Sequence, residues 1–343
     1  MITIGIDPHQ TSLTAVALAA SGAVVAMIRV EMTSSAVTRL LNWVASWEHR
    51  RWAVEGASGL GRGVAQGLAA LGESVVDVPA KLAARVRLLN TGHARKTDSI
   101  DATSVATVAQ QRGSLQPVQA EDHSVVLRLL SDRRDGLSQE RTRVVNRLHA
   151  LLRDLLPGGA RRSLSADEAG ALLRGVRPMT GVDAQRKAIA RDLLADLRRV
   201  DTALERNSAE IAEAVAENGT TLTEIPGVGP VLAAKIVGHT VTVARFPSPI
   251  HFASYCGTAP IEASSGDRKR HRLSRAGNRQ LNRAVHQIAV CQIRLRGDGR
   301  AFYQRKLDES KTPAEARRAL KRRLSDAIYR RLYRDQRRLA ARS

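Results

Sequence analysis

Short apolar runs separated by polar turns fill the N-terminal part of the chain. Residues 2–6 (ITIGI), 12–19 (SLTAVALA) and 23–30 are apolar over the length of a strand, so each is predicted to be a β-strand. Apolar residues at helical spacing then predict a helix over 34–47. The elements expected after it are a strand over 52–55, a helix over 60–71, a strand over 74–78 and a helix over 98–111.

Three antiparallel strands followed by alternating helices and strands are the element order of an RNase H-like α/β fold. We therefore expect such a domain over residues 1–112. Sugar kinases and actin-like ATPases also begin with a strand that ends in Gly-Ile-Asp, but a Gly-rich phosphate loop must follow it. Residues 8–12 (PHQTS) contain no glycine, which argues against that class.

Leucine and valine recur every seven residues in the middle of the chain. One such stretch covers 121–156 and stops at Pro157-Gly158-Gly159, and a second covers 183–217. The pattern predicts two long helices that pair antiparallel, within a helical spacer over 113–219. The pair serves either as a dimerisation arm or as the core of an ordinary helical bundle, and the pattern leaves both open.

The last part of the chain, 220–343, is predicted to be a mainly helical domain. Residues 225–231 (IPGVGPV) precede an apolar helix, as in helix-hairpin-helix modules that direct backbone N–H groups at a phosphate. The same residues also suit a plain structural turn. Further helices are expected over 276–293 and from Pro313 onward.

Positive charge concentrates in this C-terminal part. The chain has 54 Lys and Arg against 33 Asp and Glu, a formal net charge of +21. Residues 267–343 alone contain 24 basic against 7 acidic residues, a surplus of 17. A surplus gathered in one segment predicts a surface that binds the phosphates of a nucleic acid.

The remaining composition narrows the class of protein. Apolar residues make up 43% of the chain, which argues against wholesale disorder. The longest apolar stretch, 13–28, is too short and too interrupted to span a bilayer. Two cysteines, Cys256 and Cys291, exclude a disulfide framework and a Cys-rich zinc site. We therefore expect a soluble intracellular protein of the cytoplasm.

Four carboxylates stand out. Asp7 and Glu55 each end an apolar strand, where an acidic residue is costly unless it is paired or binds a metal. Asp98 and Asp101 are three residues apart, so a helix places both on one face. Oxygen ligands without cysteine or histidine suit hard divalent ions, Mg²⁺ better than Zn²⁺, and two such ions can act on a phosphodiester.

A serine near a basic segment is the second candidate feature. Ser265 lies on a Gly-bearing turn and is followed by a segment rich in Arg and Lys at 267–272 (DRKRHR). A serine hydroxyl can attack phosphorus while cations stabilise the transition state. Taken by itself, Ser-Ser-Gly is an ordinary turn.

Several motifs occur here in a characteristic order. They are Gly5-Ile-Asp-Pro-His9, Arg95-Lys-Thr-Asp-Ser-Ile-Asp101, Ile225-Pro-Gly-Val-Gly229, Gly257-Thr-Ala-Pro260 five residues ahead of Ser265, and Arg275-Ala-Gly-Asn-Arg279. Together they resemble the transposases of the insertion-sequence family one-ten, relatives of the Piv-type DNA invertases. The resemblance covers residues 1–112 and roughly 220–300.

This resemblance implies a mechanism and a set of site residues. It implies a RuvC-like domain whose metal ligands are Asp7, Glu55, Asp98 and Asp101, with two Mg²⁺ ions expected, and a nucleophile, Ser265, that forms a phosphoserine link to DNA. The implied partners are target and donor DNA, a structured bridge RNA that guides the protein, and further copies of the chain in a dimer or tetramer. The candidate phosphate contacts are Arg268, Lys269, Arg270, Arg272, Arg275 and Arg279.

Some alternatives remain at this stage. The motif Glu55-Gly-Ala-Ser-Gly59 departs from the family pattern by one residue, and Ser264 is a neighbouring candidate for the nucleophile. A metal-dependent junction endonuclease that uses water as the nucleophile has the same carboxylates. An architectural nucleic-acid-binding protein needs only the basic C-terminus, and a mechanism through Tyr255 has no further support in the sequence.

Overall fold

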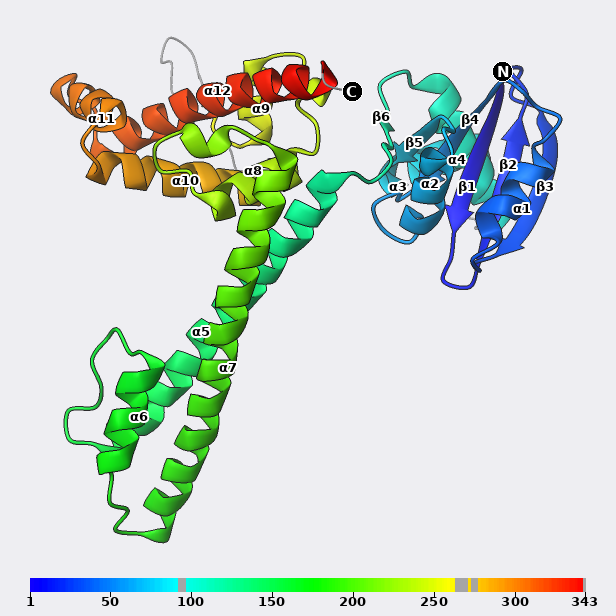
Figure 1. Cartoon of the computed structure of the whole chain (residues 1–343). Coiled ribbons are helices and arrows are strands. Elements are labelled where there is room, and N and C mark those ends of the chain that lie inside the picture. Colours follow the sequence, from blue (N-terminus) through cyan, green and yellow to red (C-terminus); the bar gives the residue numbers. More distant parts are fainter. Residues whose placement is uncertain (92–96, 263–270, 273–276, 342–343) are drawn as a thin grey trace. The chain divides into compact units, whose positions relative to one another are not determined.

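The computed structural model describes residues 1–91, 97–262, 271–272 and 277–341. The chain divides into two compact units, Met1–Glu121 and Asp122–Ser343 (Figure 1). Within the described part of the chain, each helix is too short or too polar to cross a membrane.

A six-stranded sheet in the order β3-β2-β1-β4-β5-β6 forms the centre of the first unit. Its strands are β1 (Ile2–Pro8), β2 (Ser12–Leu18), β3 (Val24–Glu31), β4 (Arg50–Glu55), β5 (Val75–Val78) and β6 (Gln116–Pro117). Strand β1 pairs antiparallel with β2 and parallel with β4, and β4 pairs parallel with β5. This arrangement confirms the predicted RNase H-like fold.

Successive residues of a strand point to opposite faces of the sheet, and each face packs against its own pair of helices. On one face, Ile4, Ile6 and Val54 pack against α1 (Ala36–Trp43) and α2 (Arg62–Ala70). On the other face, Ala53, Val76 and Val78 pack against α3 (Ala80–Thr91) and α4 (Asp98–Gln111). The odd-numbered residues of β1 therefore face α4.

Two long antiparallel helices begin the second unit, as predicted: α5 (His123–Leu155) and α7 (Gly181–Asn218), with α6 (Ala166–Gly175) between them in the chain (Figure 1). Polar contacts between the two helices join later residues of α5 to earlier residues of α7, as in an antiparallel pair. Arg134 donates to Ser208 Oγ at 2.6 Å, and Arg141 donates to Asp201 Oδ1 at 2.6 Å. The helices contribute to two separate apolar cores, one with α6 and one with the C-terminal helices.

The C-terminal helices of this unit are α8 (Pro230–Thr240), α9 (Pro249–Tyr255), α10 (Arg279–Arg294), α11 (Asp298–Asp308) and α12 (Pro313–Ala340). Two short helical turns, Leu222–Glu224 and Val243–Arg245, precede α8 and α9, and β7 (Ile261–Glu262) pairs with β8 (His271–Arg272). One side of α12 buries Leu320, Leu324 and Ile328 in the core. The basic C-terminal helix is thus a core element as well as a charged surface.

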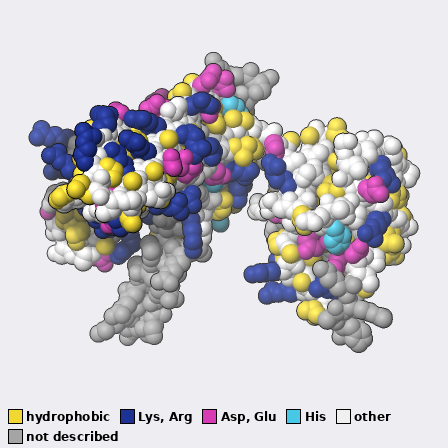
Figure 2. All heavy atoms as spheres, turned by 90° about the horizontal axis from the view of Figure 1, so that it is seen from below, with side chains coloured by type: hydrophobic (Ala, Val, Ile, Leu, Met, Phe, Trp, Pro, Cys, Tyr) yellow, Lys and Arg dark blue, Asp and Glu magenta, His cyan; other side chains and the backbone are white. Residues whose placement is uncertain are grey.

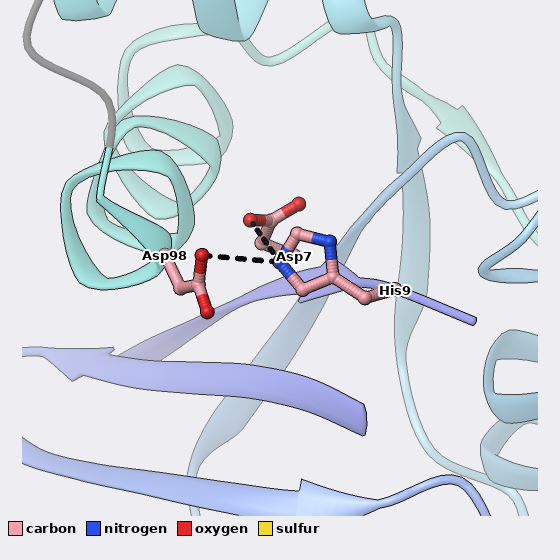
Figure 3. A group of neighbouring side chains, drawn as sticks. All are labelled: Asp7, His9 and Asp98. Carbon is pink, nitrogen blue, oxygen red and sulfur yellow. Dashed lines mark ion pairs between the residues drawn. The ribbon is translucent and has the colours of Figure 1, made fainter. Parts of the chain in front are cut away.

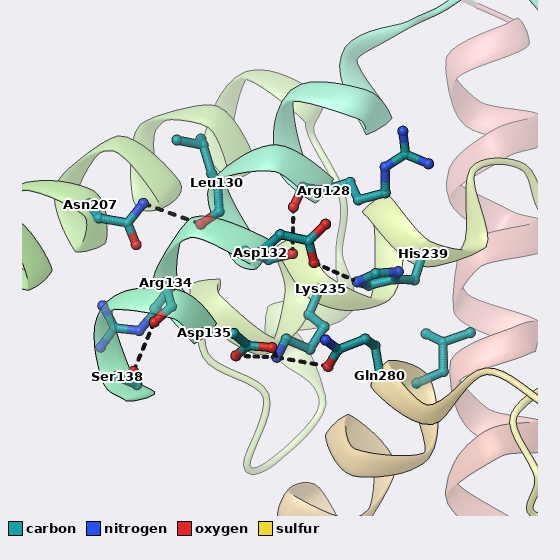
Figure 4. A network of polar contacts seen from close by, with 12 residues as sticks. Arg128, Leu130, Asp132, Arg134, Asp135, Ser138, Asn207, Lys235, His239 and Gln280 are labelled. Atoms are coloured by element: carbon teal, nitrogen blue, oxygen red, sulfur yellow. Dashed lines mark hydrogen bonds and ion pairs between the residues drawn. The ribbon is translucent and has the colours of Figure 1, made fainter. Parts of the chain in front are cut away.

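A polar network links α5 to α8 and α10 (Figure 4). Lys235 on α8 is 3% exposed, and its amino group donates to the carboxylate oxygens of Asp135 on α5 at 2.6 and 2.7 Å. It also donates to Gln280 Oε1 at 3.4 Å, in the first turn of α10. One turn further along α8, His239 lies 3.3 Å from Asp132, and burial lowers the pKa of His239. These contacts fix how α8 lies between its two neighbours.

The close approach of α4 to β1 depends on a glycine. A Cβ atom at Gly5 would lie 2.1 Å from the backbone oxygen of Ala102 and 2.5 Å from the backbone nitrogen of Ala106. Both are backbone atoms of α4, so neither can move aside as a flexible side chain could. The missing side chain lets α4 lie directly on the strand that ends in Asp7.

We expect Gly5→Ala to destabilise the first unit by roughly 3 kcal/mol or more, because the helix must lift off the sheet to admit the methyl group. All 3 tryptophans, Trp43, Trp47 and Trp52, belong to this unit, so tryptophan fluorescence during urea unfolding measures the effect. A Cβ atom at Gly63 on α2 would meet nothing within 4 Å, so Gly63→Ala is the matched control and should leave the midpoint unchanged or raise it slightly, since alanine favours a helix over glycine. Equal midpoints for the two variants would contradict the proposed packing role of Gly5.

Candidate functional site

Two of the predicted carboxylates lie at the same end of the sheet. Ile6 on β1 is paired with Val54 on the parallel strand β4, so Asp7 and Glu55 are the next residues on each strand. Both continue the side-chain alternation of Gly5 and Ala53, on the face that α4 covers. The sheet register therefore brings these two strand-ending acids to one edge beneath α4.

The other two predicted carboxylates lie in the first turn of α4. Thr97 caps this helix, and its hydroxyl oxygen accepts from the backbone nitrogen of Ile100 at 3.3 Å. The cap fixes the start of the helix at Asp98, and Asp101 follows three residues later. Since α4 lies directly on β1, its first turn is placed beside the strand end that carries Asp7.

Asp7, Asp98 and His9 form a cluster with one ligand atom from each side chain (Figure 3). His9 Nε2 lies 3.3 Å from Asp7 Oδ2 and 3.3 Å from Asp98 Oδ1. The three ligand atoms all lie within 4.8 Å of one another. The side chain of Asp98 is 41% exposed and that of His9 36% exposed, so a substrate can reach the cluster from solvent.

This donor set fits a divalent cation. Carboxylate oxygens are ligands for Mg²⁺ and Mn²⁺, and imidazole adds a ligand for first-row transition metals. Arg29 on β3 lies 3.7 Å from Asp98 Oδ2 and supplies a further cation at the rim of the cluster. His9 entered the prediction from sequence only as part of a motif, and histidine ligands were counted as missing. Its signal was its place two residues after the strand-ending Asp7.

The remaining two carboxylates lie outside that three-residue set. The carboxylate of Asp101, which is 4% exposed, forms an ion pair with Arg87 on α3. Glu55 is half-buried at the end of β4. Among the described residues, the cluster of possible metal ligands therefore consists of Asp7, Asp98 and His9, which includes two of the four predicted acids.

Most of the predicted serine site lies outside the described residues. This applies to Ser264, Ser265, Arg268, Lys269, Arg270 and Arg275. The backbone of Arg272 belongs to β8. Arg279 is exposed at the start of α10, directly after the capping residue Asn278.

The turn that precedes the predicted serine segment is tied to α10 and α12. The side-chain amide of Asn282 donates to the backbone oxygens of Cys256 and Gly257 at 2.9 and 3.0 Å. Lys321, which is 8% exposed, donates to Asn282 Oδ1 at 2.8 Å. Burial raises the pKa of the Cys256 thiol to about 12, so this thiol is no nucleophile near neutral pH. Asn282 and Lys321 were not predicted from the sequence, because only the packing relates them to the turn.

Lys and Arg side chains gather over the part of the second unit that carries the C-terminal helices (Figure 2). Most arginines of α12 are exposed away from its buried side, and α10 and α11 contribute further exposed arginines. Such a surface offers many phosphate contacts. The exposed arginines between the start of α10 and the end of α12 are Arg279, Arg283, Arg294, Arg296, Arg300, Arg305, Arg318, Arg323, Arg330, Arg334, Arg337 and Arg338.

The chain is similar to proteins of bacterial insertion elements. It is 27% identical to the "Insertion element IS116 uncharacterized 44.8 kDa protein" of Streptomyces clavuligerus, over 96% of this chain and 94% of that protein. It is 28% identical to the "Insertion element IS900 uncharacterized 42 kDa protein" of Mycobacterium paratuberculosis, over 68% of this chain and 70% of that protein. Among solved structures, RuvC of T. thermophilus in complex with Holliday junction substrate matches 34% of this chain and 99% of that chain, with a TM-score of 0.28 and 17% identity.

Two family models match the two ends of the chain. The model for DEDD transposases of the IS110 type, described as "Transposase", matches residues 4–157. The model described as "Transposase IS116/IS110/IS902 family" matches residues 219–304. The two models name one family and together cover more than half of the residues, so the chain belongs to the IS116/IS110/IS902 family of transposases and is a DNA transposase with an RNase H-like N-terminal domain.

Proposed function

We propose that this transposase is an RNA-guided DNA recombinase that cuts and rejoins strands through a phosphoserine link at Ser265. Divalent ions held by Asp7, Glu55, Asp98 and Asp101 would assist the reaction. The protein would insert, excise or invert a mobile element, with a structured bridge RNA pairing to target and donor DNA. Base pairing would then carry the sequence specificity, and the protein would need only backbone contacts.

The meeting of Asp7 and Asp98 is the observation that carries the metal-assisted part of this proposal. The two acids are distant in sequence, yet both lie within 3.3 Å of one imidazole nitrogen at an accessible edge of the sheet. Acidic side chains brought together in this way repel one another unless a cation lies between them. When bound there, a divalent ion supplies charge stabilisation at the oxygens of a phosphodiester.

The covalent step would use the serine hydroxyl. The Oγ atom of Ser265 attacks phosphorus, the bond between phosphorus and the 3′-oxygen of the strand breaks, and the leaving oxygen takes up the proton that the serine releases. The phosphoserine bond conserves the energy of the broken phosphodiester. Attack by a 3′-hydroxyl of another strand then releases the serine and restores a phosphodiester, so rejoining needs no further cofactor.

The basic surface of the C-terminal helices supports a nucleic-acid partner for the second unit. Its exposed arginines, together with Arg268, Lys269, Arg270, Arg272 and Arg275, would hold the phosphates of DNA and of the guide RNA. The long antiparallel pair of α5 and α7 is the proposed element for assembly into a dimer or tetramer, in which the carboxylate cluster and the serine come from different copies.

A second candidate is a metal-dependent junction endonuclease in which water attacks the phosphodiester. The observation that favours it is the cluster of Asp7, His9 and Asp98. Its carboxylates and imidazole lie next to solvent, and a metal-bound water there could attack a phosphodiester without a serine nucleophile. This candidate predicts free 5′-phosphate ends and no covalent protein–DNA product.

The test is a trapping experiment with the full chain, DNA of the element's end and its insertion site, and RNA transcribed from the DNA beside the gene. We expect a covalent protein–DNA adduct on a denaturing gel with the unchanged chain. Ser265→Ala should abolish the adduct and leave DNA binding unchanged, because a single hydroxyl contributes little to a polyphosphate interface.

Ser264→Ala is the matched control, since it removes the neighbouring hydroxyl and should leave the adduct intact. Adduct formation by Ser265→Ala would refute the assignment of the nucleophile. Cleavage without any adduct in the unchanged chain would favour the water-dependent endonuclease. Equal adduct yields with and without the transcribed RNA would refute the guided mechanism.

A further inference from the structure

The ring of His9 lies between the two carboxylates of the cluster instead of pointing away from them (Figure 3). Its Nε2 atom is at the same distance, 3.3 Å, from Asp7 Oδ2 and from Asp98 Oδ1. The hairpin after β1 holds this residue in place, because the backbone nitrogen of His9 donates to the backbone oxygen of Ser12 at 2.8 Å. The imidazole is therefore presented to both acids by a fixed part of the sheet.

These distances match neighbouring positions on one metal ion. Two ligand atoms that each lie about 2.1 Å from an ion, at a right angle to each other, are about 3.0 Å apart. The nitrogen-to-oxygen distances of 3.3 Å exceed that value by only a few tenths of an ångström. The third pair of atoms is no more than 4.8 Å apart. A small closing movement of three side chains would complete a shared site.

We propose that His9 is a nitrogen ligand of the divalent ion that Asp7 and Asp98 share, and that it makes this site prefer Mn²⁺ over Mg²⁺. The inference rests on the proposed metal-assisted function and adds to it a ligand and a metal preference. Mg²⁺ favours a shell of oxygens alone, whereas Mn²⁺ accepts imidazole nitrogen together with carboxylate oxygen. An all-carboxylate site in the same place discriminates less between the two ions.

The opposite role for His9 has a distinct consequence. If the imidazole only neutralises the two acids as an ion-pair partner, it competes with a metal for them. Its removal would then strengthen metal binding. If it is a ligand, its removal weakens the binding of Mn²⁺ and changes the binding of Mg²⁺ much less. Whether Mn²⁺ binding becomes stronger or weaker when His9 is removed therefore distinguishes the two roles.

The experiment uses Mn²⁺ alone as the probe, added to the full-length chain without nucleic acid. Pulsed electron paramagnetic resonance detects a directly bound nitrogen as a coupling to the Mn²⁺ signal. We expect this coupling in the unchanged chain and its loss in His9→Ala. The ratio of Mn²⁺ to Mg²⁺ affinity, measured by titration, should fall at least about tenfold in that variant.

Two further variants sharpen the result. His49→Ala removes an exposed histidine of the same unit and should retain the nitrogen coupling. His9→Gln offers an amide oxygen in place of nitrogen, so it should hold Mn²⁺ without the coupling and with a reduced preference. As a control for folding, both His9 variants should have the same thermal unfolding midpoint as the unchanged chain.

Nitrogen coupling that persists in His9→Ala, or Mn²⁺ binding that becomes tighter, would overturn the proposal. Asp98→Asn separates this failure from a failure of the proposed function. If Asp98→Asn binds Mn²⁺ as well as the unchanged chain does, the carboxylate site itself is refuted. If Asp98→Asn loses Mn²⁺ while the unchanged chain has no nitrogen coupling, only the role of His9 is refuted.

Discussion

Asp7→Asn is expected to lower DNA strand cleavage by roughly a thousandfold or more, which corresponds to about 4 kcal/mol of lost transition-state stabilisation. The substitution keeps the size and shape of the side chain and removes its negative charge. Asp7 is 7% exposed at the end of β1 and lies 3.3 Å from His9 Nε2, so the charge acts where the proposed ion would bind. Single-turnover cleavage of labelled DNA measures the loss.

Glu31→Gln is the matched control for this prediction. Glu31 also ends a strand of the same sheet, but it is exposed at the edge strand β3. Its neutralisation should leave cleavage within about twofold of the unchanged chain, as expected for an isolated surface charge. DNA affinity, measured by fluorescence anisotropy, should be retained by both variants. Normal cleavage by Asp7→Asn would leave the cluster without a catalytic role.

Asp135→Ala is expected to destabilise the second unit by about 3–5 kcal/mol, because it leaves the ammonium group of Lys235 buried without its partner. The side chain of Lys235 is 4% exposed, and the carboxylate of Asp135 provides both of its short contacts. Gln280, at 3.4 Å, offers only a neutral oxygen. The effect should appear as faster hydrogen exchange of the backbone amides of α8, α5 and α10.

The double variant Lys235→Met/Asp135→Leu tests whether the loss comes from the unpaired charge. Removing both charges replaces the pair with apolar side chains of similar size, so most of the lost stability should return. Hydrogen exchange is the suitable measurement, since the 3 tryptophans all lie in the first unit and their fluorescence does not follow α8. A double variant that is less stable than Asp135→Ala would contradict this explanation.

The helices and strands with a clear local pattern were predicted close to their observed bounds. The helix expected over 98–111 is α4 (Asp98–Gln111), and the expected strands at 2–6 and 12–19 are β1 and β2. The helices α3 (Ala80–Thr91), α6, α9 and α11 were not predicted. In α3, Leu88 and Leu89 are exposed at 55% and 84%, so its apolar residues do not form the single buried stripe that identifies a helix.

The candidate site was predictable in its chemistry and only partly in its geometry. The helix predicted over 98–111 correctly placed Asp98 and Asp101 in the first turn of one helix. It could not predict that Arg87 pairs with Asp101, since that contact depends on how α3 packs beside α4. Nor could it predict the place of His9, which is set by the register between β1 and β2.

The sequence by itself determined the order of the elements, the strand-ending and helix-starting acids, and the basic character of the C-terminal helices. These properties depend on spacing within a few residues, which periodicity and capping express directly. Only the tertiary structure decided which acids meet and what lies between them. That outcome depends on the sheet register and on the absence of a side chain at Gly5, which lets α4 bring Asp98 to Asp7 and His9. Contacts between residues so far apart in the chain leave no periodic trace in the sequence, because they arise only when the helix packs on the sheet.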